Sequence, residues 1–293
     1  MRLVLLSKLL LAVIAFTTVT CFGQTTYSQV PNQARLQAQQ ELNQATYSYR
    51  EGRFADAEAH SEKAVGLDPQ NRTALAFLAR CLHAQYRPGV NTEENLAKAE
   101  QAIAAYKRIL ELVPNDEESY KAIAYLFGAM NDDESQRAWI FKRASDTSID
   151  ATKRADAYVA LASKDWDCSF KLTEHPTTKE IEIDDRGKAT VRYLLPKESK
   201  EFETAKQCAT SGFSLAQLAI GLAPENESAW SFKTNLLLEL AKLSQMSKDE
   251  SERQRLLREY EIALAETTRL AQANQDAKER VKEERAKSKP KPF

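Results

Sequence analysis

Three short segments that each contain a proline recur along the chain, and they constrain its fold more than any other feature. They read LDPQN at 67–71, LVPND at 112–116 and LAPEN at 222–226. Proline cannot continue the helix before it, and an Asn or Asp one or two residues later can cap the amides of the next helix. Each segment therefore predicts the end of one helix and the start of another, so we expect repeated helical units.

The composition favours helices over strands throughout. Only 8 glycines and 9 prolines are spread over 293 residues, and long stretches are rich in Ala, Leu, Glu, Lys, Gln and Arg. With 43% hydrophobic residues the chain can build a sizeable core. The formal net charge of -1 provides no broad basic surface, so we do not expect nucleic acid as a partner.

The region that leads to the first of these prolines has small residues at regular positions. They are Ala45, Gly52, Ala57 and Ala64, and the region closes at Pro69. The stretches 49–57 and 62–69 resemble the loop and second helix of the tetratricopeptide repeat, a unit of about 34 residues that folds as two antiparallel helices. The resemblance implies an all-α solenoid of stacked antiparallel helix pairs, with about five such units.

Later units depart from this pattern. The second exceeds the repeat length by about 11 residues, which fit a loop at 86–92, and the third lacks the loop glycine and the closing proline. The fourth is interrupted by an insertion, with helices expected at 152–166 and 202–222. The fifth ends in a charged helix from about 252 to 282. We expect the solenoid to span 35–285, between a flexible segment at 24–34 and a disordered tail at 286–293.

The insertion, at about 170–198, breaks the helical pattern. Polar and apolar residues alternate at 180–183 and at 189–193, on either side of the turn sequence DDRGK. This pattern predicts a β-hairpin. Because an isolated hairpin is marginally stable in water, we expect its apolar face to pack on a neighbouring helix. That face consists of Ile181, Ile183, Val191 and Tyr193.

Cys168 and Cys208 lie in the two helices expected for the fourth unit. Antiparallel neighbours would bring these positions together, so we predict a disulfide between them; two buried free thiols are the alternative. Cys81, inside an apolar helix, is predicted to be a small core residue.

The N-terminus is typical of an exported protein. Arg2 and Lys8 precede the apolar run 9–16, and small and polar residues follow as far as Gly23, which is the layout of a signal peptide at 1–23. Lipidation at Cys21 is one alternative, although Thr18-Val19-Thr20 fits a lipoprotein signal poorly. An uncleaved N-terminal anchor is another, which Lys8 disfavours because it interrupts the apolar stretch. No later segment is apolar enough to span a bilayer, so we expect a location in the periplasm or cell envelope.

The sequence lacks the usual signatures of catalysis and of cofactor binding. Its three histidines, His60, His83 and His175, form no zinc motif, and there is no CxxC pair and no glycine-rich phosphate loop. We therefore predict no metal, no cofactor and no enzymatic activity.

The resemblance to tetratricopeptide repeats places a binding groove on the first helix of each unit. The positions that it implies for partner contacts are Tyr49, Arg50, Arg80, His83, Lys121, Tyr125 and Asn235. Their mixture of basic and aromatic side chains suits an acidic or C-terminal peptide. We expect a scaffold or adaptor for other exported or envelope proteins. The alternative is a carbohydrate or small-ligand binder with an aromatic pocket beside Trp166, Tyr193 or Trp230.

Overall fold

The computed structural model describes residues 31–183 and 185–287, and side chains as far as 284. The predicted signal peptide, Cys21 and most of the predicted tail lie outside the described residues. The described part forms one 3-10 helix at Pro176–Thr178, a two-stranded sheet and ten α-helices. The helices are α1 (Asn32–Arg50), α2 (Phe54–Leu67), α3 (Arg72–Gln85), α4 (Glu93–Leu112), α5 (Glu117–Ala129), α6 (Asp133–Ser145), α7 (Ala151–Thr173), α8 (Ser199–Leu222), α9 (Glu227–Met246) and α10 (Glu250–Lys287).

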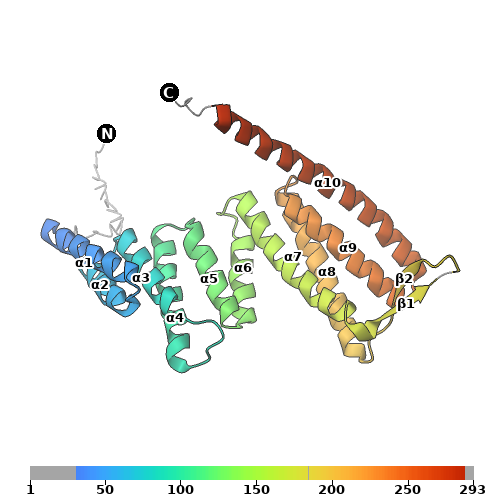
Figure 1. The fold of residues 1–293 in the computed structure, drawn as a ribbon, viewed down its shortest axis with the longest axis horizontal. Helices are drawn as coiled ribbons and strands as arrows, with labels where there is room; N and C mark the ends of the chain where they lie inside the picture. The colour runs from blue at the N-terminus through green and yellow to red at the C-terminus, as the bar shows by residue number, and fades with distance from the viewer. Residues whose placement is uncertain (1–30, 184, 288–293) are drawn as a thin grey trace, which may run out of the picture.

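Consecutive helices pack as antiparallel pairs, and the pairs follow one another in a row from α1 to α10 (Figure 1). The buried apolar residues divide along this row. One cluster joins α1 to α5 around Leu75, Ile109, Ile123 and Leu126, and smaller clusters continue through α6 to α10. Each pair thus buries its apolar stripe against the next pair, which confirms the predicted all-α stack with a hairpin insertion.

The three proline-containing segments cap helices as the sequence predicts. Asn71, Asp116 and Asn226, each two residues after the proline, accept hydrogen bonds from backbone amides in the first turn of α3, α5 and α9. The three donor–acceptor distances are 3.1, 2.9 and 3.1 Å. These side chains satisfy amides that would otherwise lack partners at the start of a helix.

A second repeated feature is the turn inside a helix pair. Gly52, Asn131 and Lys248 each lie two residues after the end of the first helix and two residues before the start of the second. All three have a positive φ, of 74°, 59° and 61°. The same two backbone hydrogen bonds close each turn. The third and fifth units therefore keep the turn of the first unit without its glycine, which explains why the sequence showed them only weakly.

The fourth pair is longer than expected. Helix α7 continues to Thr173 and α8 begins at Ser199. This corrects the sequence prediction, in which the first helix ended at 166 and the second began at 202. The predicted bridge between Cys168 and Cys208 joins these two helices. Cys81 is buried and free, as predicted.

The hairpin consists of β1 (Lys179–Ile183) and β2 (Ala189–Tyr193), in an antiparallel register that places Ile181 opposite Val191. The expected packing of its apolar face is wrong for three of the four residues. Ile181 is 70% exposed, Ile183 71% and Val191 47%; only Tyr193 packs against the helices. The hairpin is held at its base and projects from the helical row (Figure 1), so the outer part of its apolar face has no helix beneath it.

Two boundaries differ slightly from those expected. Helix α1 begins three residues before position 35, and α10 ends two residues after position 285. Within the described ranges, none of the helices combines the length and the apolar character that crossing a bilayer requires.

Candidate functional site

The first helices of the first three pairs, α1, α3 and α5, carry most of the predicted partner-binding residues. We call the set Tyr49, Arg80, His83, Lys121 and Tyr125, with the acidic neighbour Glu118, the first-helix surface. Tyr49 lies on α1, and Arg80 and His83 lie on α3. Glu118, Lys121 and Tyr125 lie on α5. Contacts between these two helices decide what the surface offers to a partner.

Arg80 forms an ion pair across the two helices. Its Nε and Nη2 atoms donate to Oε1 of Glu118 at 2.9 and 2.6 Å, and both side chains are about half exposed. The hydrogen bonds that Arg80 donates to Glu118 raise the pKa of its guanidinium further, so the group stays charged. Because the carboxylate offsets that charge, Arg80 offers a partner less positive potential than its sequence position implies.

His83 belongs to an aromatic cluster. Its ring stacks on Tyr125 with centroids 5.5 Å apart and lies edge-on to Tyr106, whose hydroxyl is 3.4 Å from Nδ1 of His83. Burial lowers the pKa of His83 below its ordinary value and raises the pKa of Tyr106 to about 12. Both side chains are therefore neutral at pH 7, and His83 contributes a flat ring rather than a charge.

Tyr125 completes this cluster at the surface. It is 54% exposed although its ring stacks on His83. An exposed aromatic ring held in one orientation by a neighbour loses little entropy on binding, which is a property of good contact residues. The pair of His83 and Tyr125 is therefore the firmest contact point on this surface.

The other predicted residues neither stack on nor hydrogen-bond to this cluster, although Lys121 lies one helical turn before Tyr125 on α5. Tyr49 packs edge-on against Phe54 and Phe77, at 5.0 and 5.5 Å, and joins α1 to its neighbours. Arg50 and Lys121 are exposed at the surface of α1 and α5. Asn235 is partly buried on α9, in the C-terminal half of the row. The structure thus brings together Arg80, His83 and Tyr125, and it places Asn235 elsewhere.

Two important residues escaped the sequence interpretation. Glu118 lies seven residues before Tyr125, on the same face of α5 and two turns away. A search for acidic residues two turns from each predicted contact would have found it. Tyr106 belongs to the second helix of its pair, and no helical pattern indicates that its hydroxyl reaches His83.

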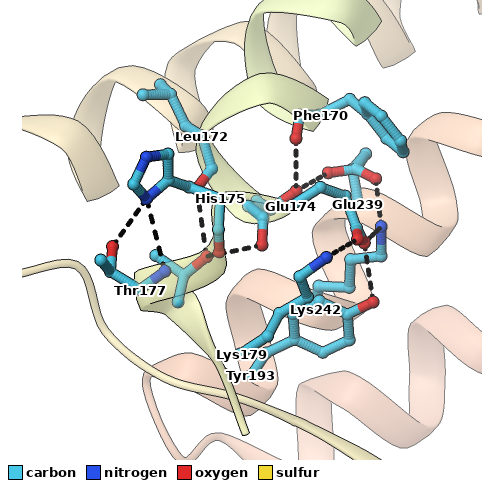
Figure 2. A network of polar contacts seen from close by, with 11 residues as sticks. Phe170, Leu172, Glu174, His175, Thr177, Lys179, Tyr193, Glu239 and Lys242 are labelled. Atoms are coloured by element: carbon cyan, nitrogen blue, oxygen red, sulfur yellow. Dashed lines mark hydrogen bonds and ion pairs between the residues drawn. The ribbon is translucent and has the colours of Figure 1, made fainter.

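A second polar cluster lies at the base of the hairpin (Figure 2). Lys242 of α9 donates to Glu239 at 2.6 Å and to Glu174 at 2.7 Å, and Glu174 also accepts from Lys179 and from the hydroxyl of Tyr193 at 2.8 and 2.7 Å. Two carboxylates thus meet two ammonium groups. This network joins the hairpin to the end of α7 and to α9.

Burial makes this network sensitive to the loss of any member. Glu239 is 1% exposed and Lys242 7%, and Thr173 gives Glu239 a further hydrogen bond of 2.5 Å. Desolvation raises the pKa of Glu174, but the hydrogen bonds from Lys179, Lys242 and Tyr193 outweigh it and lower the pKa to about 2. Every member finds its partners inside the network, so we interpret it as the anchor of the hairpin.

Comparisons with known proteins add little to this description. No protein family and no curated protein sequence matches the chain. Among solved structures, a MamA protein is 11% identical, with 80% of this chain and 94% of that chain covered and a TM-score of 0.40. MamA from Desulfovibrio magneticus RS-1, residues 41 to the end, is 12% identical, with 76% and 96% covered and a TM-score of 0.33. These distant likenesses transfer no function to the chain.

Proposed function

We propose that this protein is an exported scaffold of the tetratricopeptide repeat type, which binds a segment of another envelope protein on the first-helix surface. It acts by binding rather than by catalysis. The observation that carries the proposal is the exposed ring of Tyr125, stacked on His83 beside the exposed Lys121. An aromatic platform next to a cation suits a peptide or helix that presents an apolar residue near an acidic one.

The location in the cell envelope or periplasm rests on two observations. Residues 1–23 have the layout that predicts a signal peptide, and the bridge between Cys168 and Cys208 fits an oxidising compartment. We propose cleavage after Gly23 rather than lipidation at Cys21, because Thr18-Val19-Thr20 fits a lipoprotein signal poorly.

The alternative of a carbohydrate or small-ligand binder has less support. It requires an aromatic pocket beside Trp166, Tyr193 or Trp230. Trp166 packs on Phe170 and Phe232, Tyr193 belongs to the hairpin anchor, and the indole of Trp230 donates to the carbonyl of Pro224. Contacts within the protein thus occupy all three side chains.

Crosslinking and co-purification from cell-envelope fractions test the proposal. We expect the wild-type chain to retain a defined partner protein, and the double variant Lys121→Glu with Tyr125→Ala to lose it. Lys206→Glu, which reverses an exposed charge on α8, is the matched control and should retain the partner. Recovery of no partner, or equal recovery by the wild type and the double variant, would reject this function.

A further inference from the structure

A hollow of about 600 Å³ opens between α4 and α6, with α5 as its floor. Leu110, Phe127 and Trp139 form its apolar lining, and Lys107 and Lys142 lie at its rim. A smaller hollow lined in part by the same Leu110, Trp139 and Lys142 continues it toward Tyr120. The two together form one depression, which we call the α4–α6 hollow.

This depression is separate from the first-helix surface. Tyr120 and Phe127, which line it, lie seven residues apart on one face of α5. At about 100° per residue, that face is roughly 140° around the helix from the face of Glu118, Lys121 and Tyr125. A ligand in the α4–α6 hollow would therefore leave the first-helix surface free.

The aromatic lining is held in place by the protein. The indole Nε1 of Trp139 donates to the carbonyl of Tyr120 at 3.2 Å, and the two rings stack with centroids 5.9 Å apart. Arg143, which lies 4.0 Å from the centroid of the Tyr120 ring, is paired with Glu117. The ring of Trp139 is therefore oriented before any ligand arrives, which lowers the entropy cost of binding to it.

The positive charge at the rim is only partly balanced within the protein. The ammonium group of Lys107 lies 5.9 Å from the centroids of Phe127 and Trp139, and in the part of the chain that the structure describes neither Lys107 nor Lys142 forms an ion pair. Glu111 is the one carboxylate among the residues that line the larger hollow, and Asp146, whose pKa is lowered by hydrogen bonds from Ser148 and further by Lys142, lines the smaller one. At the larger hollow, two lysines against one glutamate leave an excess of positive charge beside an apolar surface.

Another hollow, formed by Phe54 of α2, the end of α3, the loop that follows and the start of α4, provides an internal comparison. It has a volume of about 500 Å³ and also contains a lysine, Lys98. That lysine donates to both carboxylate oxygens of Glu58 at 2.8 Å, and Gln85 donates to the same carboxylate. The lysine in this hollow is thus held in an ion pair, whereas the two lysines of the α4–α6 hollow form none among the described residues.

From this contrast we propose that the α4–α6 hollow is a second binding site, for a peptide segment of a partner protein in which a bulky apolar residue is flanked by acidic residues. The apolar side chain lies against Trp139 and Phe127, and the carboxylates meet Lys107 and Lys142. A peptide suits the site because the depression is open along its length and continues past Trp139.

Fluorescence anisotropy with labelled pentapeptides tests this site on the full chain. The probe has phenylalanine between two glutamates; one control replaces both glutamates by glutamine, and another replaces phenylalanine by alanine. We expect saturable binding of the probe and affinities weaker by about tenfold or more for both controls. No saturable binding of the probe, or equal binding of the controls, would overturn the proposal.

Variants assign the binding to this depression. Lys107→Glu with Lys142→Glu, and the milder Lys107→Gln with Lys142→Gln, should weaken probe binding by about tenfold or more. Lys107 and Lys142 are both exposed, so circular dichroism should show unchanged folding in both double variants. Undiminished binding by the folded glutamine variant would contradict the site, as would equally tight binding of free N-acetylphenylalanine, which would indicate a small-molecule site.

The same assay separates this site from the first-helix surface. Lys121→Glu with Tyr125→Ala should leave the affinity for the probe unchanged, although it abolishes capture of the envelope partner. A loss of probe binding in that variant would place the peptide on the first-helix surface and reject the second site.

Discussion

At the scale of single residues, neighbours change what a side chain can do. Arg80 and His83 look like two basic contacts in the sequence, but Glu118 offsets the charge of one and burial keeps the other neutral. The positions of both on α3 follow from the repeat pattern. Their protonation and pairing do not, because they depend on residues of α4 and α5 that lie 23 to 38 positions away.

Glu174 makes the stability of the protein depend on pH. Its pKa in the folded state is about 2, below its ordinary value of about 4.3, so its stabilising contribution is complete above pH ~4.3 and falls as the pH approaches 2. We expect Glu174→Gln to lower the free energy of unfolding by about 2 kcal/mol at pH 7.

Urea unfolding of both proteins between pH 2 and 7 measures this contribution. The difference between the wild type and Glu174→Gln should be widest above pH ~4.3 and should narrow below it. A difference that stays constant over this range would show that Glu174 does not act through its charge.

Two glycines of α8 should respond in opposite ways to substitution by alanine. A Cβ atom at Gly212 would meet Leu236 at 2.8 Å and Cβ of Asp165 at 2.9 Å, whereas one at Gly221 would meet nothing within 4 Å. We expect Gly212→Ala to destabilise the protein by about 1 to 3 kcal/mol and Gly221→Ala to be neutral or slightly stabilising. Thermal unfolding of both variants checks this, and equal shifts would contradict the close packing of α7, α8 and α9.

At the scale of secondary-structure elements, the sequence predicted those features that depend on nearby residues. The strands of the hairpin and the caps at Asn71, Asp116 and Asn226 follow from short patterns. The packing of the hairpin face does not. It depends on an anchor that joins Glu174 to Lys242, 68 residues later, and this anchor holds only the base of the hairpin.

The turn at Lys248 provides a test of the repeated helix-pair geometry. Its φ of 61° is unfavourable for a residue with a Cβ atom, and glycine occupies the same place in the first unit. We expect Lys248→Gly to stabilise the protein by about 1 kcal/mol. Lys206→Gly, in the middle of α8, is the control and should destabilise it by a similar amount. Destabilisation by both would contradict the left-handed conformation of the turn.

The bridge between Cys168 and Cys208 should contribute substantially to the stability of the fourth helix pair. It closes a loop with a sequence separation of 40, for which chain entropy predicts a stabilisation of about 4 kcal/mol. We expect the double variant Cys168→Ser with Cys208→Ser to unfold at lower urea concentration under oxidising conditions. Addition of a reductant should lower the stability of the wild type and leave the stability of the double variant unchanged. Wild-type stability that does not respond to the reductant would reject a structural role for the bridge.

At the scale of the whole molecule, the row of helix pairs explains both proposed sites. Stacking places the first helices of successive pairs side by side, so α3 and α5 build the first-helix surface together. The same arrangement leaves a depression between the second helices α4 and α6. The repeat pattern predicted the stack. It did not indicate the depression, because the volume between two helices depends on how the side chains of a third helix fill it.

Site-specific photocrosslinking in cells is the most direct test of the claim that the first-helix surface holds a partner protein. A photoreactive phenylalanine derivative replaces Tyr125 in one variant and Ile262, 69% exposed on α10, in another. We predict a discrete adduct with one protein from position 125, lost when Lys121→Glu is added, and no such adduct from position 262. The absence of an adduct at position 125, or the same adducts from both positions, would contradict the account.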